Sequence, residues 1–274
     1  MHVIISAAAA GLVAILATVA IEKLGGRRGG VIGTLPTTVV PAAVGFWWGA
    51  ANVADFRDAL YVVPAGMMVN ALFLWSWRVL PVRLPDWTLR TRLLVMIALS
   101  MAAWGVMAFL LLQATEAYRG AALPMPVWGW GFFLAAVLFG TVACLRNGPA
   151  PAGTRHVGPV TLLARGVLAA SAIGLAVALA TVAGPVIAGI VSIFPAIFIT
   201  TMVALWLSQG EAVPSGAVGP MMLGSTSVSA YALLAATLMP LTGAAVGASL
   251  AWIGSVLLVT LPAWRFLGRV RERD

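Results

Sequence analysis

Two prolines within long apolar stretches, Pro36 and Pro195, are the positions where this sequence is best suited to hold a ligand. A proline inside a helix has no N–H to donate and crowds the carbonyl four residues back, which frees the carbonyl of Ile32 or Val191. Four glycines weaken the same stretches, namely Gly30, Gly33, Gly184 and Gly189. Interrupted helices at matching positions of two halves indicate a transport site. The alternative is a packing kink, because membrane helices tolerate proline and glycine.

Hydroxyl and amide side chains near these prolines offer hydrogen bonds to a ligand, although hydroxyls also bond their own helix backbone. Asn70 lies in the middle of another apolar stretch and is expected to face the interior of a helix bundle. We predict that the two proline segments face each other across a substrate-binding pocket. Its predicted residues are Thr34, Pro36, Thr37, Thr38, Asn70, Ser192, Pro195 and Thr200.

Charged side chains are almost absent from the apolar stretches. Glu22 and Asp58 border them, and Arg165 lies about two turns inside one, from where it can extend to the membrane surface or face an anionic substrate. A pocket with few charges favours a neutral, zwitterionic or weakly anionic solute. We expect no catalytic residue, no cofactor and no metal ligand, since both histidines lie outside the expected helices and the two Met-Met pairs suit core packing.

The composition indicates an all-α membrane protein. Hydrophobic residues make up 62% of the 274 residues and charged residues 9%, with a mean hydropathy of +1.03. Apolar runs of about 20 residues match the thickness of a bilayer core, and lipid requires helices in such runs. We expect nine transmembrane helices, at about residues 3–21, 31–50, 59–80, 93–113, 127–145, 159–181, 186–207, 217–238 and 243–264.

The chain carries an internal repeat. The decapeptides that begin at Gly11 and Gly174 are identical at seven of ten positions, and Pro36 and Pro195 lie 159 positions apart, as do Trp47 and Trp206. This pattern predicts a four-helix repeat over 1–113, a linking helix and loop over 114–158, and a second repeat over 159–274 with a basic tail. One linking helix reverses the second copy, so we expect two inverted repeats with the site at their interface.

Basic residues set the expected orientation. With nine helices, fourteen of the 16 lysines and arginines fall on the side that includes the carboxyl terminus. Positive charge stays in the cytoplasm, which predicts a bacterial inner-membrane protein with its amino terminus outside. Membrane lipids then account for the basic balance, and we expect no nucleic-acid partner.

Small residues recur at four-residue spacing in the last expected helix, at Gly243, Gly247 and Ala251. Such a stripe allows close helix packing, either within the chain or between two copies in a homodimer.

The run AGIVSIFPAIFITTMVALW resembles the GlpM-like family and related bacterial membrane families of about four helices. Gly189, Phe194 and Pro195 carry the resemblance, as do Gly30, Leu35 and Pro36 in the first copy. It implies a loose link to exopolysaccharide production and supplies no substrate or catalytic residue. We expect a secondary transporter of a small molecule. The alternative is a non-transporting scaffold or accessory subunit in envelope assembly.

Overall fold

The computed structural model describes residues 3–12, 15, 35–146, 158–182 and 184–271, and within them all regular structure is helical, with no strand. The all-α prediction is therefore confirmed for this part of the chain. An amino-terminal helix, Val3–Leu12, comes first. The first half continues with α3 (Val39–Gly49), α4 (Val53–Val79), a short 3₁₀ turn (Pro81–Arg83), α5 (Leu89–Gly120) and α6 (Met125–Leu145).

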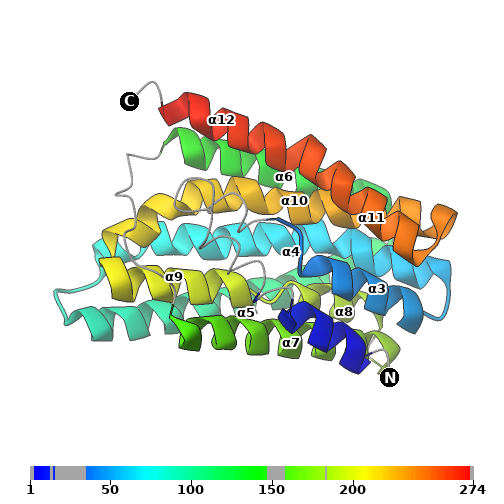
Figure 1. Cartoon of the computed structure of the whole chain (residues 1–274), viewed down its shortest axis with the longest axis horizontal. Helices are drawn as coiled ribbons and strands as arrows, with labels where there is room; N and C mark the ends of the chain where they lie inside the picture. Colours follow the sequence, from blue (N-terminus) through cyan, green and yellow to red (C-terminus); the bar gives the residue numbers. More distant parts are fainter. Residues whose placement is uncertain (1–2, 13–14, 16–34, 147–157, 183, 272–274) are drawn as a thin grey trace.

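The second half begins with α7 (Pro159–Val182), α8 (Pro185–Ser192) and α9 (Ala196–Gln209). It continues with α10 (Ala212–Thr242) and α11 (Ala244–Ser255), then a π-helical turn (Val256–Thr260) and α12 (Leu261–Arg271). The helices lie side by side along one direction, and the two termini are at opposite ends (Figure 1).

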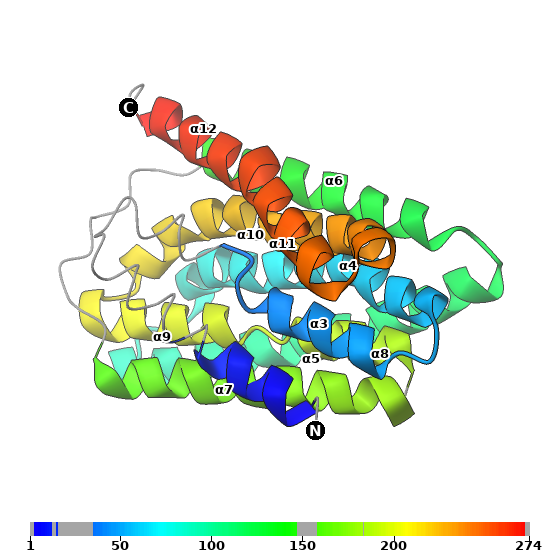
Figure 2. The same ribbon diagram turned by 45° about the vertical axis from the view of Figure 1, so that its right-hand side comes forward.

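Two long helices, α4 and α10, pack against each other at the centre of the bundle. Both views place them between α6 and α12 on one side and α7 on the other (Figures 1 and 2). Most of each central helix is buried, whereas α5 and α6 expose large apolar side chains such as Phe109 and Leu138. Apolar residues that face outward are costly in water and favourable in lipid, so this distribution is compatible with a membrane protein.

Six helical stretches among the described residues are long and apolar enough to cross a membrane. They are Val53–Val79, Leu89–Gly120, Met125–Leu145, Val186–Leu207, Pro214–Thr242 and Ala244–Arg269. Shorter apolar helices occupy the remaining three predicted positions, at Val3–Leu12, Val39–Gly49 and Gly166–Leu179. That all nine helices cross the membrane, and that the two halves form an inverted repeat, stay predictions.

Several predicted boundaries need correction. The helix expected over 31–50 begins at Val39 within the described residues, because residues 35–38 after the glycine-rich stretch are not helical. The helix expected over 217–238 begins at Ala212 and continues to Thr242, with Pro240 inside it. The helix expected to end at 113 runs to Gly120. The linker 147–157 lies outside the described residues.

Charged residues form ion pairs at the two ends of the bundle, which is compatible with helices that cross a membrane. The start of α4 and the end of α5 meet at one end, where Arg119 forms an ion pair of 3.0 Å with Asp58. The end of α4 and the start of α5 meet at the other end, where Arg92 pairs with Glu211 at 2.9 Å. Among the described residues, the buried polar side chains are the amide of Asn70 and the hydroxyls of nine serines and threonines, and none of them is charged.

The small-residue stripe of α11 is used inside the chain. Gly247 and Ala251 are buried, and a methyl group at Gly247 would lie 2.5 Å from the Cα of Met239 on α10. Only Gly243 of the three is exposed. Packing within the chain therefore accounts for the stripe, and a homodimer through it stays a prediction.

Candidate functional site

The apolar stretch 186–207 is broken in its middle rather than continuous. Helix α8 ends at Ser192 and α9 starts at Ala196, with Pro195 in the position before its first residue. The backbone N–H groups of Ile193 and Phe194 close tight turns onto the carbonyls of Ile190 and Val191. Pro195 has no N–H and cannot continue the α-helical bonding pattern. The break was expected at this proline, and it separates two half-helices.

The carbonyl freed by the break is that of Ile193, not that of Val191 as predicted. Val191 accepts a hydrogen bond from Phe194, whereas the oxygen of Ile193 accepts one from the side chain of Asn70 at 2.8 Å. An unpaired carbonyl in an apolar interior costs about 1–3 kcal/mol. The Asn70 amide therefore stabilises the break by capping the oxygen that no helix uses.

Asn70 is held on both sides of its amide. Its nitrogen bonds Ile193, and its oxygen accepts a hydrogen bond of 2.9 Å from the indole nitrogen of Trp104 on α5. The Trp104 ring also meets Phe194 edge-on, with centroids 5.4 Å apart. Only 2% of Asn70 is exposed, so its predicted inward orientation is confirmed. One side chain thus connects α4, α5 and the broken helix.

Two glycines let the broken helix approach α4 closely. A methyl group at Gly66 would lie 2.6 Å from Cγ1 of Ile193, and one at Gly189 would lie 2.6 Å from the carbonyl oxygen of Ala59. At both positions a side chain would require a neighbouring group to move. These contacts fix α8 and the break against the centre of α4.

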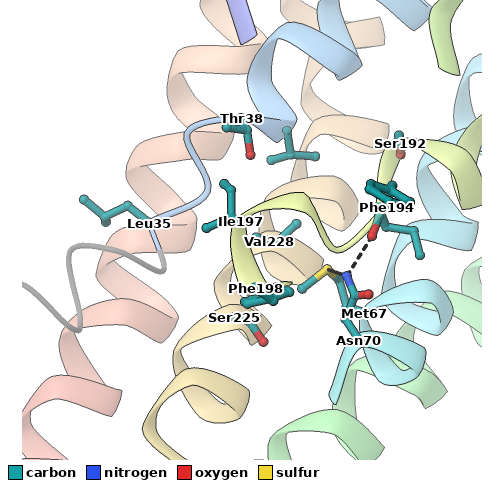
Figure 3. Close-up of a pocket in the computed structure, with 12 residues that line it drawn as sticks. Leu35, Thr38, Met67, Asn70, Ser192, Phe194, Ile197, Phe198, Ser225 and Val228 are labelled. Carbon is teal, nitrogen blue, oxygen red and sulfur yellow. Dashed lines mark hydrogen bonds between the residues drawn. The ribbon is translucent and has the colours of Figure 1, made fainter. Parts of the chain in front are cut away.

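A cavity of about 70 Å³ lies beside the break (Figure 3). A cavity needs only about 10–15 Å³ of this kind of space for each water, so this one can take several waters or a small solute. Its polar residues come from four segments, and its walls are otherwise apolar, with no charged residue. The lining residues are Leu35, Thr38, Val39, Met67, Asn70, Ser192, Ile193, Phe194, Ile197, Phe198, Ser225 and Val228.

Three of the predicted site residues, Thr38, Asn70 and Ser192, line this cavity together. They bring the segment after Pro36 and the segment before Pro195 to opposite walls, as Figure 3 shows. Ser192 also donates to the carbonyl of Gly189 at 2.7 Å, while Thr38, in the position before α3, makes no side-chain capping bond to that helix.

The other predicted residues do not line it. Pro36 and Pro195 are buried beside it. The hydroxyl of Thr37 is 3.5 Å from the carbonyl of Leu35, and that of Thr200 bonds Ala196 at 2.8 Å within its own helix. Thr34 lies outside the described residues. Ligand binding by any of these residues stays a prediction.

Sequence reasoning missed Trp104, Phe194 and Ser225 as members of this site. Phe194 stands next to Pro195, and Ser225 starts a run of hydroxyl residues in α10, so both carried a usable signal. Trp104 carried none, because nothing distinguishes it from the other tryptophans of apolar stretches.

In the described part of the chain, no three His, Cys, Asp or Glu side chains come together in a group that could hold a metal ion.

No protein-family model, curated protein or solved structure matches this chain. The site is therefore interpreted from its own geometry.

Proposed function

We propose that the chain is an integral membrane secondary transporter of a small neutral, zwitterionic or weakly anionic solute. The observation that carries this proposal is the cavity at the broken helix, where a membrane-length stretch stops and restarts around an amide-capped carbonyl. Secondary transporters place their substrates at such interruptions, because the freed backbone groups can exchange partners with a ligand.

The lining supports the proposed substrate class. Thr38, Asn70, Ser192 and Ser225 provide hydrogen-bonding groups, and none carries a charge. A bare ion would lose its hydration without a compensating opposite charge, which is strongly unfavourable. Asn70, Ser192 and Ser225 already bond within the protein, so a small solute with hydroxyl, amide or balanced charges would share or exchange these hydrogen bonds.

The proposed setting is the bacterial inner membrane, with the Arg92 end of the bundle in the cytoplasm and the site at the interface of two inverted repeats. The central helices α4 and α10 correspond to each other under the 159-residue offset and pack together, which supports this arrangement. The prevalence of arginine at the same end supports the orientation.

Reconstitution into liposomes tests the proposal. Erythritol, glycine and lactate represent the neutral, zwitterionic and weakly anionic classes. We expect the protein to accelerate entry of at least one of them over protein-free liposomes, and Thr38→Val to reduce that acceleration. Equal entry with and without protein for all three would favour the alternative, a non-transporting scaffold or accessory subunit in envelope assembly.

A further inference from the structure

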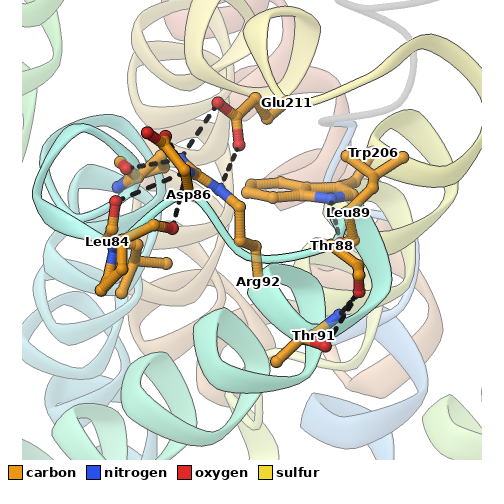
Figure 4. Close-up of polar contacts among 10 residues, drawn as sticks. Leu84, Asp86, Thr88, Leu89, Thr91, Arg92, Trp206 and Glu211 are labelled. Carbon is orange, nitrogen blue, oxygen red and sulfur yellow. Dashed lines mark hydrogen bonds and ion pairs between the residues drawn. The ribbon is translucent and has the colours of Figure 1, made fainter.

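Arg92, at the start of α5, is a largely buried arginine that joins two separate turns. Its side chain is 11% exposed. Its guanidinium donates to the carbonyls of Pro81 at 2.8 Å and Pro85 at 3.0 Å, and it meets both carboxylate oxygens of Glu211, at 2.9 and 3.1 Å (Figure 4). One of the two contacts with Glu211, from Nη2 to Oε1, is a hydrogen bond between charged groups, which is stronger than one between neutral groups, and the other is an ion-pair contact.

Glu211 connects this contact to the end of α9. It follows Gln209 and Gly210, and Gly210 adopts φ of 82°, a conformation that suits glycine and ends the helix sharply. One turn earlier, the indole nitrogen of Trp206 donates to the carbonyl of Leu89 at 3.3 Å, and its ring meets Trp77 edge-on at 5.9 Å. The carboxyl end of α9 is therefore attached to the α4–α5 turn by an ion pair and by a tryptophan.

The other end of α9 is the break beside the cavity. Ile197 and Phe198, in its first turn, line that cavity. From Phe198 an apolar cluster that includes Phe73, Trp77 and Met202 extends along the helix to Trp206. Helix α9 thus begins at the break beside the cavity and ends where Trp206 and Glu211 contact the α4–α5 turn.

We propose that the Arg92–Glu211 pair is the latch of a gate that closes the cavity on the predicted cytoplasmic side. In this proposal α9 rotates about the break at 193–195, which serves as the hinge. The hydrogen bond from Trp206 to Leu89 is a second contact that holds α9 in the closed position. The inference rests on the proposed function, since it assigns the gate of the same site. Opening exchanges the ion pair and the Trp206 bond for contacts with water, and the apolar cluster separates as α9 moves.

Thiol accessibility tests this latch without knowledge of the substrate. Cys144 is the one cysteine of the chain, so Cys144→Ser gives a cysteine-free background in which Ser192→Cys places a thiol in the cavity. The probe is a charged, membrane-impermeant methanethiosulfonate added to inside-out vesicles. We expect Glu211→Gln to raise its rate of reaction about fivefold, because removal of a charged hydrogen bond shifts the population toward the open state.

Asp86→Asn is the matched control. It removes a carboxylate that also faces Arg92, but at 3.7 Å and from a fully exposed side chain, so the reaction rate should stay unchanged. Trp206→Phe removes the bond to Leu89 and replaces a fully buried indole that packs on Trp77 with a smaller ring, so it weakens the attachment of α9 at this end and should also raise the rate. Unchanged rates in both Glu211→Gln and Trp206→Phe, or an equal rise in Asp86→Asn, would overturn the latch. If Glu211→Gln raises the reaction rate but the unmodified protein transports none of the three solutes, the latch is supported and the transport function is contradicted.

Discussion

The side-chain amide of Asn70 donates a hydrogen bond of 2.8 Å to the backbone carbonyl of Ile193, 123 positions later in the chain. This bond joins a buried position of α4 to the interruption between α8 and α9. The same amide accepts from Trp104, so both of its polar atoms are used within the protein. A ligand that enters the cavity meets a polar group already engaged with the backbone of the broken helix.

Replacing Asn70 should destabilise the protein. Asn70→Leu leaves the carbonyl of Ile193 and the indole of Trp104 without partners in an apolar interior, for a loss of about 2–4 kcal/mol from two unsatisfied groups. Thermal unfolding in detergent would measure it. Trp104→Phe is the comparison, since it retains a ring against Phe194, keeps the bond to Ile193 and leaves only the Asn70 oxygen without a donor, with an expected loss of about 1–2 kcal/mol. Equal stability of Asn70→Leu and the unmodified protein would contradict the role of Asn70 as a cap.

Gly189→Ala should disrupt the packing of α8 on α4. The added methyl group would lie 2.6 Å from the backbone oxygen of Ala59, which cannot rotate away, so the helices must separate. We expect a loss of about 1–3 kcal/mol, as in other overpacked interiors. Gly105→Ala on α5 is the matched control because nothing lies within 4 Å of its added methyl group. It should be neutral or slightly stabilising in the same unfolding assay.

Substitutions of the neighbouring residues Thr37 and Thr38 test which hydroxyl after Pro36 contacts the solute. Thr38 lines the cavity and Thr37 does not. Thr38→Val keeps the shape and removes the hydroxyl, so it should lower solute entry into proteoliposomes while leaving the unfolding temperature nearly unchanged. Thr37→Val should lower entry less than Thr38→Val does, because Thr37 does not line the cavity and its hydroxyl lies 3.5 Å from the carbonyl of Leu35. If Thr37→Val lowered solute entry more than Thr38→Val, the binding surface would lie outside this cavity.

The expected topology can be tested with reporter fusions at Ala122, in the turn between α5 and α6, and at Gly153, in the linker before α7. The uneven distribution of arginine predicts an external Ala122 and a cytoplasmic Gly153. The same reading from both fusions would contradict the number of crossings, and exchanged readings would contradict the orientation.

The sequence was sufficient to predict the helical class, the break at Pro195 and the inward position of Asn70, because each follows from local chemistry. Composition requires helices in lipid, proline interrupts one of them, and an amide in an apolar stretch must find a partner. The identity of that partner could not be predicted. The contact of Asn70 with Ile193 and Trp104 depends on how three helices pack, and no local pattern in the sequence encodes that packing.

Which of Thr37 and Thr38 lines the cavity could not be predicted, for a related reason. A helix was expected from residue 31, but residues 35–38 are non-helical, so helical spacing could not predict which hydroxyl faces inward. The Arg92–Glu211 pair was missed because the two residues are 119 positions apart and each looked like an ordinary charge at the end of a helix.

The central claim is that the cavity at the broken helix is reached from each side of the membrane in turn. Ser192→Cys in the Cys144→Ser background tests it most directly, with an impermeant thiol reagent applied separately to right-side-out and inside-out vesicles. We expect the thiol to react from both sides, and erythritol, glycine or lactate, whichever the protein transports, to slow both reactions. A thiol that reacts from neither side, in a protein that elutes as a single folded species in detergent, would contradict it.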